Sequence, residues 1–383
     1  MAGSDISGKS TAGKLETLDL EGTSIVSGGG NYYNSNSTSN NIIGDYMFYN
    51  CSKLTTIKVP NNVTLIGNSA FDGCSSLSSI TVPNSVLSIG LNAFRNCRNL
   101  KNFTIQDGTV ELRFENAFNS HFSGSSIETL YLGRNLADDT SGKALYHPSP
   151  FSGNPVLKSV TIGSNVTMVN RNSFNDCIGL QSIILGRGLT EIGNNAFHGC
   201  MSLTGMLTIP NKVRILGDSS FEGCSSLSSI TVPNSVLSIG LNTFRNCRNL
   251  KTFTIQDGTV ELRFENAFNS HFSGSSIETL YLGRNLADDI SGRALYHPSP
   301  FSGNSALKSV TIGNNVTEIN RNSFFNCIGL NEIRISRTTP PTAGLRCFEG
   351  ISKTVCRVYV PSSSVSVYRA VNGWSEFTNI SAL

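Results

Sequence analysis

The sequence predicts a solenoid, in which short coils stack on one another and each coil adds one strand to a parallel β-sheet. Two nested repeats support this prediction. Residues 71–180 reappear as residues 221–330 with 12 differences over 110 positions, and phenylalanine recurs every 23 residues inside each copy. A fixed period of about 20 to 50 residues is typical of repeat proteins whose neighbouring repeats bury a common core. The phenylalanines concerned are Phe48, Phe71 and Phe94; Phe151, Phe174 and Phe197; Phe221 and Phe244; and Phe301 and Phe324.

The first half of each repeat predicts a short strand. In the type repeat 77–98, LSSITVPNSVLSIGLNAFRNCR, apolar residues alternate with Ser79 and Thr81 along the segment Leu77–Val82. Alternation of branched apolar residues with small polar ones indicates a strand with one buried face. Pro83 should end the strand, because proline has no N–H to donate to a neighbour.

The second half of the repeat predicts the segments that return the chain to the start of the next strand. Val86 and Ile89 form a second apolar pair, and Gly90 marks a sharp corner of the chain. Alanine, phenylalanine, cysteine and leucine then follow at helical spacing, so we expect one short helical turn over Asn92–Cys97. Three sides and three corners would close one coil.

The repeated pattern, which reads ITVPNSVLSIGLNAFRNCRNL over residues 80–100, resembles the BspA-like class of leucine-rich repeats. The resemblance covers nearly everything from Leu54 to Leu330 and implies a leucine-rich repeat solenoid of α/β type. Such a solenoid has parallel strands, short helical or 3-10 turns, 23-residue coils and a right-handed superhelical path. Proteins of this class are typically exported surface proteins of gut and oral anaerobes. The resemblance implies adhesion or other protein binding, with no cofactor and no enzymatic activity.

Four segments are expected along the chain. Residues 1–14 form a flexible leader or an expression remnant, and residues 15–53 form an opening repeat with a long polar loop. Residues 54–336 form the solenoid with its duplication, and residues 337–383 resemble the C-terminal cap of the class. Whether the duplication was selected or is a recent chance event stays open.

Composition excludes several classes of function. Charged residues make up 14% of the chain and the net charge is +3, with no cluster of Lys and Arg of the kind that binds nucleic acid. The apolar runs are far shorter than the roughly 20 residues that span a bilayer. The N-terminus has no apolar stretch of a signal peptide, so an extracellular or cell-surface location requires a leader outside this chain.

The cysteines predict buried thiols instead of a disulfide framework. Eight of the ten occupy one repeat position, where equivalent side chains run parallel and do not aim at one another as a disulfide requires. His121, Asn154, His271 and Asn304 are expected in the same position of other coils. Cys347 and Cys356 lie outside the repeat register, and both free thiols and a bridge between them stay open. The eight column residues are Cys51, Cys74, Cys97, Cys177, Cys200, Cys224, Cys247 and Cys327. No metal site is expected, because C-x-x-C pairs are absent from the sequence.

Candidate binding residues lie where the rhythm breaks identically in both copies. From Phe118 to Phe151, and again from Phe268 to Phe301, the spacing has an excess of 10 residues over the 23-residue rhythm. Insertions in repeat proteins often carry binding, although a tolerated surface loop is the alternative. The same coils place a tyrosine on the outward side of the strand, and aromatic side chains are favoured at interfaces. The candidates are Tyr131, Asp138, Asp139, Tyr146 and His147 in one copy, and Tyr281, Asp288, Asp289, Tyr296 and His297 in the other.

These observations favour a monomeric binding or adhesion module with a protein or glycan partner, such as host extracellular matrix or mucin. A spacer that presents another domain is the alternative. A hydrolytic or metal-dependent enzyme is disfavoured, because the repeat positions are mostly Ser, Thr and Asn and supply no converging acid, base or metal ligands.

Overall fold

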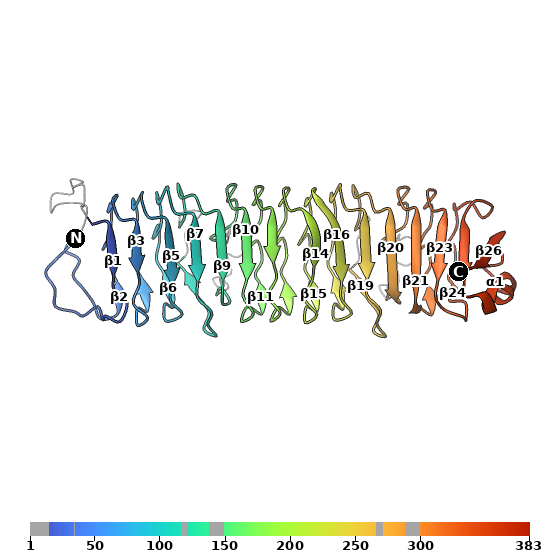
Figure 1. Ribbon diagram of the computed structural model, residues 1–383, viewed down its shortest axis with the longest axis horizontal. Coiled ribbons are helices and arrows are strands. Elements are labelled where there is room, and N and C mark those ends of the chain that lie inside the picture. The colour runs from blue at the N-terminus through green and yellow to red at the C-terminus, as the bar shows by residue number, and fades with distance from the viewer. Residues whose placement is uncertain (1–14, 34, 116–120, 138–148, 266–270, 288–298) are drawn as a thin grey trace. The chain divides into compact units, whose positions relative to one another are not determined.

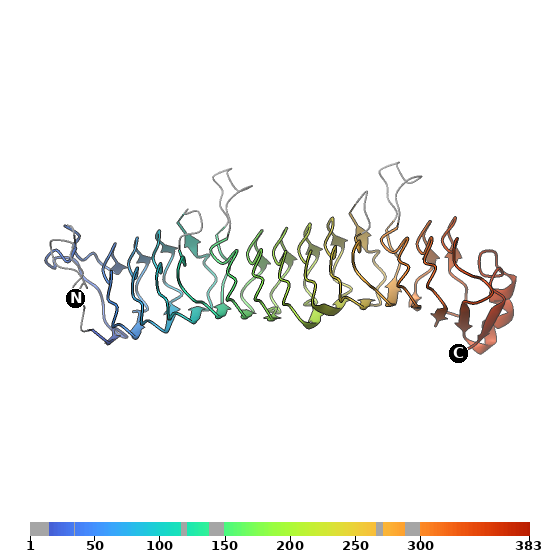
Figure 2. The same ribbon diagram turned by 90° about the horizontal axis from the view of Figure 1, so that it is seen from above.

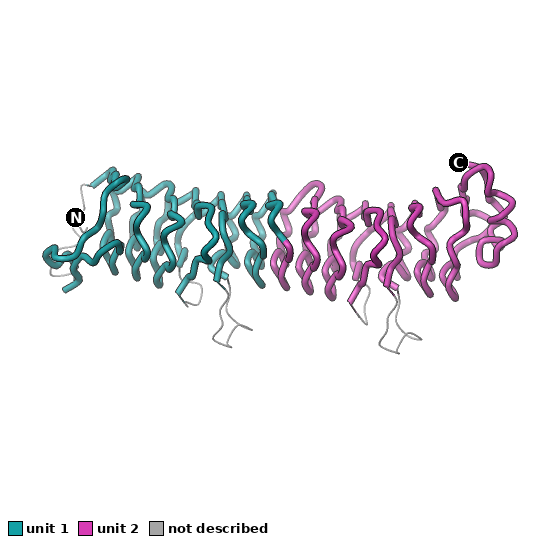
Figure 3. The backbone as a smooth tube through the Cα atoms, turned by 90° about the horizontal axis from the view of Figure 1, so that it is seen from below, with its two compact units in different colours: residues 1–189 teal, residues 190–383 magenta. Residues whose placement is uncertain are grey.

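The structure, a computed structural model, describes residues 15–33, 35–115, 121–137, 149–265, 271–287 and 299–383. The chain divides into two compact units, residues 1–189 and residues 190–383 (Figure 3). Each unit is a parallel β-solenoid with very little helix, which confirms the predicted fold class (Figure 1).

The first unit contains a principal sheet and a narrower one, both parallel. The principal strands pair in the order β12-β10-β9-β7-β5, with β1 and β3 pairing separately, and the narrower sheet has the order β2-β4-β6-β8. The strands are β1 (Thr17–Asp19), β2 (Ile42–Ile43), β3 (Thr56–Lys58), β4 (Leu65–Ile66), β5 (Ser79–Val82), β6 (Ser88–Ile89), β7 (Asn102–Ile105), β8 (Arg113–Phe114), β9 (Thr129–Leu132), β10 (Ser159–Ile162), β11 (Met168–Val169) and β12 (Ser182–Ile184).

The second unit repeats this arrangement and adds a terminal helix. Its principal sheet has the order β14-β16-β18-β20-β21-β23-β25-β26, and its narrower strands pair as β13-β15-β17-β19 and β22-β24. The elements are β13 (Glu191–Ile192), β14 (Gly205–Thr208), β15 (Ile215–Leu216), β16 (Leu227–Val232), β17 (Ser238–Ile239), β18 (Thr252–Ile255), β19 (Arg263–Phe264), β20 (Thr279–Arg284), β21 (Ser309–Asn315), β22 (Glu318–Ile319), β23 (Glu332–Ile335), β24 (Thr342–Ala343), β25 (Arg357–Val360), η1 (Ser362–Ser364), α1 (Val365–Ala370) and β26 (Asn379–Ala382).

Equivalent residues of successive coils lie directly beside one another. In the first unit Thr81 pairs with Thr104, Thr104 with Tyr131, and Tyr131 with Thr161. Figure 2 shows the coils of each unit side by side. In the type repeat the predicted inward residues Ile80 and Val82 are buried, and the alternating residues Ser79 and Thr81 face solvent. The sheet therefore has one apolar face in the core and one hydroxyl-rich face towards water.

A stack of phenylalanine rings forms the centre of each unit. Phe48, Phe71 and Phe94 stack with ring centroids 5.2 and 5.5 Å apart, and Phe197 and Phe221 repeat the contact at 5.4 Å. All five are nearly or fully buried. The phenylalanines that recur every 23 residues in the sequence therefore stack as one column of rings in each unit.

The segment Asn92–Cys97 contains turns and no helix, which differs from the expected helical turn. Asn92 and Asn96, two residues before and two after Phe94, have φ of 55° and 57°. Left-handed residues interrupt a right-handed helix, and asparagine tolerates this conformation better than most residues. Backbone bonds instead join neighbouring coils, as from the Phe71 amide to the Ala93 carbonyl oxygen (2.9 Å).

Phe118, from which the 33-residue spacing was counted, lies outside the described residues, and another phenylalanine continues the ring column between Phe94 and Phe151. This residue is Phe122, whose ring centroid lies 5.7 Å from that of Phe94 and 5.3 Å from that of Phe151. Phe272 takes the same place in the second unit. Two long coils therefore share an excess of 11 residues over two 23-residue periods, since Phe122 lies 28 positions after Phe94 and Phe151 lies 29 positions after Phe122.

Gly90 is required for close approach between coils. A Cβ atom there would lie 2.6 Å from the Asn68 backbone nitrogen, a distance that real Cβ atoms do not reach. The Gly90 amide donates to the Ile66 carbonyl oxygen at 2.7 Å. The predicted corner glycine thus permits contact with the preceding coil.

The C-terminal residues cover the last coil of the second unit. Trp374 is buried, its Nε1 donates to the Pro341 carbonyl oxygen at 2.7 Å, and its ring lies 4.9 Å from Phe348. Tyr368 of α1 donates to the Arg337 carbonyl oxygen at 2.9 Å. The division into the four expected segments stays a prediction.

Candidate functional site

The candidate site in the first unit is a tyrosine and an aspartate on the water-facing side of the principal sheet. Tyr131 of β9 is half-buried, and its hydroxyl donates to Asp107 at 2.9 Å from Oδ1 and 3.1 Å from Oδ2. Asp107 follows β7 and is exposed. Burial first, and then the Asp107 hydrogen bond and charge, raise the pKa of Tyr131. The hydrogen bond fixes the direction of the ring.

The second unit contains the same pair. Tyr281 of β20 donates to Oδ2 of Asp257 at 2.8 Å. Burial and then Asp257 raise the pKa of Tyr281 to about 12. We call Tyr131 with Asp107, and Tyr281 with Asp257, the tyrosine pairs.

Glycines make room for each tyrosine pair. A Cβ atom on Gly163 would lie 2.8 Å from Asp107 Oδ1 and 3.0 Å from the Tyr131 hydroxyl oxygen. A Cβ atom on Gly313 would lie 2.5 Å from Asp257 Oδ1. A side chain at either glycine would displace the carboxylate from the tyrosine.

The predicted outward direction of Tyr131 and Tyr281 agrees with their positions in the strands, but their aspartate partners were not anticipated. The other candidates, Asp138, Asp139, Tyr146, His147, Asp288, Asp289, Tyr296 and His297, lie outside the described residues.

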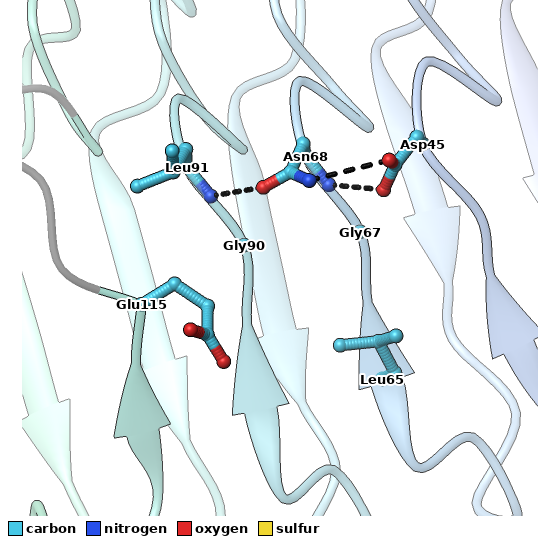
Figure 4. A pocket seen from close by; sticks show the side chains of 7 residues that line it. All are labelled: Asp45, Leu65, Gly67, Asn68, Gly90, Leu91 and Glu115. Carbon is cyan, nitrogen blue, oxygen red and sulfur yellow. Dashed lines mark hydrogen bonds between the residues drawn. The ribbon is translucent and has the colours of Figure 1, made fainter.

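A groove of about 390 Å³ lies on the narrower sheet of the first unit (Figure 4). Asp45 Oδ1 accepts the Asn68 amide at 2.7 Å, and Asn68 Oδ1 accepts the Leu91 amide at 2.8 Å. Glu115 accepts the Ser88 hydroxyl at 2.7 Å. These polar groups form hydrogen bonds with one another and link adjacent coils, so their role in this groove is structural.

Metal ligands do not converge within the described ranges. No group of three or more His, Cys, Asp or Glu side chains there could hold a metal ion. Among the same residues, no helix has the length and apolar character needed to cross a membrane.

The repeated cysteines are buried free thiols in the structure. Cys97 Sγ donates to the Phe71 carbonyl oxygen at 3.1 Å, and Cys74 Sγ to that of Phe48 at the same distance. Burial raises the pKa of Cys97 to about 12. The column thiol therefore bonds to the backbone of the preceding coil.

The structure corrects the expected place of His121 and His271 in that column. His121 precedes Phe122 and holds the position of Ala93, because the Phe94 amide donates to its carbonyl oxygen at 3.2 Å. The cysteine position of the second-unit coil belongs to Ser275, whose hydroxyl donates to the Phe244 carbonyl oxygen at 2.6 Å. Asn154 and Asn304 do lie three residues after their ring-column phenylalanines, and their Nδ2 atoms donate to the carbonyl oxygens of Ile127 and Ile277.

Cys347 and Cys356 are free and buried in the structure, which forms no bridge between them. Cys347 precedes Phe348 of the ring stack, so it occupies the position that alanine holds in the type repeat. Burial raises the pKa of each thiol to about 12.

A buried arginine was not predicted from the sequence. Arg134 has 0% exposure, and its Nη2 donates to the carbonyl oxygens of Pro83 (3.0 Å) and Val86 (2.7 Å). Its Nη1 donates to those of Asn84 (3.0 Å) and Val110 (3.3 Å). Burial lowers the pKa of the guanidinium group. One side chain therefore links three coils.

Arg284 repeats this arrangement in the second unit, with four bonds to carbonyl oxygens between 2.8 and 3.2 Å. The sequence offered no signal for it, because arginine is normally exposed and nothing around Leu-Gly-Arg-Asn distinguishes it.

The chain is similar over 96% of its length to a leucine-rich repeat protein from Bacteroides ovatus (19% identity, 92% of that chain, TM-score 0.46). It is similar over 97% to a leucine-rich cell surface protein from Faecalibacterium prausnitzii (21% identity, 89% of that chain, TM-score 0.33). It is also similar over 99% to the pneumococcal vaccine antigen PcpA (17% identity, 82% of that chain, TM-score 0.34).

The search of curated proteins found no match. The sequence model of the BspA type leucine-rich repeat region matches residues 34–139, 147–278 and 295–371, in six copies. These segments make up most of the chain and contain the stacked coils described above. The protein therefore belongs to the family of BspA-type leucine-rich repeat proteins.

Proposed function

We propose that the protein is a non-enzymatic binding module of the bacterial cell surface, which attaches to a protein or glycan of a host or a neighbouring cell. Membership of a repeat family supports a binding scaffold. One observation carries the proposal further: the water-facing sheet presents the same fixed tyrosine pair in both units.

The tyrosine pairs suit binding for two physical reasons. An aromatic ring supplies a large contact area, and tyrosine is over-represented among residues that dominate interface energies. The hydrogen bond between Tyr131 and Asp107 already holds the ring in one direction, so less side-chain entropy is lost when a partner arrives. The neighbours Thr104 and Thr161 are small, which leaves the ring accessible.

Biolayer interferometry against extracellular-matrix proteins and mucin glycans tests the proposal. We compare the wild type with Tyr131→Ser/Tyr281→Ser, which gives both coils a small hydroxyl side chain like those of their neighbours. The conservative control Tyr131→Phe/Tyr281→Phe keeps the rings. Binding that the serine variant loses and the phenylalanine variant largely keeps supports the tyrosine pairs.

A deletion variant separates the sheet from the insertions. It lacks residues 137–149 and 287–299, which contain all eight remaining candidate residues. If the deletion variant loses binding and the tyrosine variants keep it, the binding site lies on the insertions. If neither the wild type nor any variant binds, the result favours a spacer that presents another domain.

A further inference from the structure

A basic edge lies in the first unit, where β7, β9 and β10 begin. Lys101, Glu128 and Lys158 each directly precede one of these strands, and backbone bonds of 2.9 and 2.8 Å hold the three in line. The Glu128 carboxylate lies 3.3 Å from the Lys101 ammonium and 2.6 Å from that of Lys158. One carboxylate therefore holds two ammonium groups at the edge of the sheet.

Arg98 adds a third cation to this edge. It lines, with Lys101, Glu128 and Lys158, a groove of about 370 Å³ that we call the basic groove. Arg98 is exposed, and its guanidinium group has no hydrogen bond or ion pair with any residue that the structure describes. Three cations against one carboxylate leave a net charge of +2. Coulomb attraction near a protein surface favours an acidic ligand at such a place.

The other side of the basic groove is apolar. Pro155 and Val156 line it, and Val156 is 41% exposed. Ile178, in the next coil, is 46% exposed. None of the described residues that line the groove is aromatic, whereas a bound sugar ring commonly stacks on an aromatic side chain. A polypeptide can present an acidic and an apolar side chain together, so it matches both sides of the groove.

The equivalent coils of the second unit keep the charged residues of the basic groove and replace its two apolar residues. In the second unit Glu278 lies 3.1 Å from Lys251 and 2.5 Å from Lys308. Ser305 and Ala306 stand where the first copy has proline and valine. The second copy is therefore a natural control for the apolar contribution.

We propose that the basic groove docks an acidic polypeptide segment of a partner protein. Asp or Glu carboxylates of the segment pair with Arg98, Lys101 and Lys158, and an apolar side chain between them packs on Pro155 and Val156. An exposed guanidinium group can receive a carboxylate through two parallel hydrogen bonds. This inference goes beyond the proposed function and does not require that the tyrosine pairs bind anything.

Fluorescence anisotropy with short labelled peptides tests the proposal. The probes are peptides of alternating Glu and Leu, of Gln and Leu, and of Glu and Ser. The background protein is the full chain with Arg248→Glu/Lys308→Glu, which changes the net charge of the equivalent group in the second copy from +2 to −2. We expect the Glu-Leu peptide to bind most tightly, with an affinity that falls as salt is added.

Two variants in this background locate the contact. Arg98→Glu/Lys158→Glu should weaken the Glu-Leu peptide about tenfold or more, because attraction becomes repulsion. Pro155→Ser/Val156→Ala, which copies the second unit, should weaken the Glu-Leu peptide and leave the Glu-Ser peptide unchanged. Arg113→Glu makes a charge change outside the groove and should have little effect.

Several results would overturn the proposal. The basic groove does not dock acidic segments if Gln-Leu binds as well as Glu-Leu, or if the charge reversal changes nothing. Binding of a sulfated oligosaccharide without any acidic peptide would also reject it, in favour of a glycan. Thermal unfolding checks that each variant is folded. Tyr131→Ser should leave peptide binding intact, so this result is independent of the proposed tyrosine site.

Discussion

Replacing the buried arginine should destabilise the first unit strongly. Arg134→Ala removes four hydrogen bonds, of which the two to Pro83 and Val86 are buried. A buried carbonyl oxygen that loses its partner costs about 1 to 3 kcal/mol, so two of them cost about 2 to 6 kcal/mol. Arg134→Met keeps much of the side-chain volume and should cost a similar amount, because the carbonyl oxygens are still unpaired.

Urea unfolding followed by circular dichroism measures this effect. The matched variant Arg284→Ala should show a similar loss in the second unit, because its four contacts are equivalent. Arg113→Ala, at an exposed position of β8, is the control and should change the free energy of unfolding by no more than about 0.5 kcal/mol. A loss below about 1 kcal/mol for both buried arginines would refute the linking role.

The core and the site allow four further predictions. Phe94→Ala should cost about 3 to 5 kcal/mol of unfolding free energy in the same urea assay, and a loss near zero would contradict the ring column. Because the pKa of Cys97 is raised from 9.0 to about 12, its stabilising contribution is complete below pH 9 and should be lost towards pH 12; labelling of this thiol in the native state would contradict its burial. Burial lowers the pKa of His121 from 6.5, so the free energy of unfolding should fall as the pH drops below 6.5. His121→Asn should lessen that fall, and an equal fall in the variant would contradict the burial of the imidazole. Asp257→Asn should lower the pKa of Tyr281 in an ultraviolet titration, and an unchanged value would show that the hydrogen bond is absent.

The sequence predicted the architecture because the repeat positions follow from the geometry of a coil. Apolar residues two positions apart had to face the core, as Ile80 and Val82 do, and phenylalanines one period apart had to stack. The spacing of the apolar residues around Phe94 predicts a helical turn, whereas the asparagines on either side favour the turns that the structure contains. Those asparagines carried the signal, since this residue tolerates positive φ.

Other features could not be predicted from the sequence. The place of Phe122 in the ring column depends on how a longer coil closes, which the regular 23-residue rhythm does not indicate. Arg134 bonds to carbonyl oxygens about 50 positions earlier, and such contacts leave no local pattern. The partnership of Tyr131 with Asp107 was missed for the same reason, since 24 residues separate them.

The proposed function requires that partners bind on the water-facing sheet around the tyrosine pairs. Hydroxyl-radical footprinting, with and without a partner identified by interferometry, measures this most directly. We expect Tyr131 and Tyr281 to become protected from oxidation in the complex, while the exposed Leu87 beside the narrower sheet is oxidised as before. Protection at Leu87 with both tyrosines still fully oxidised would contradict it.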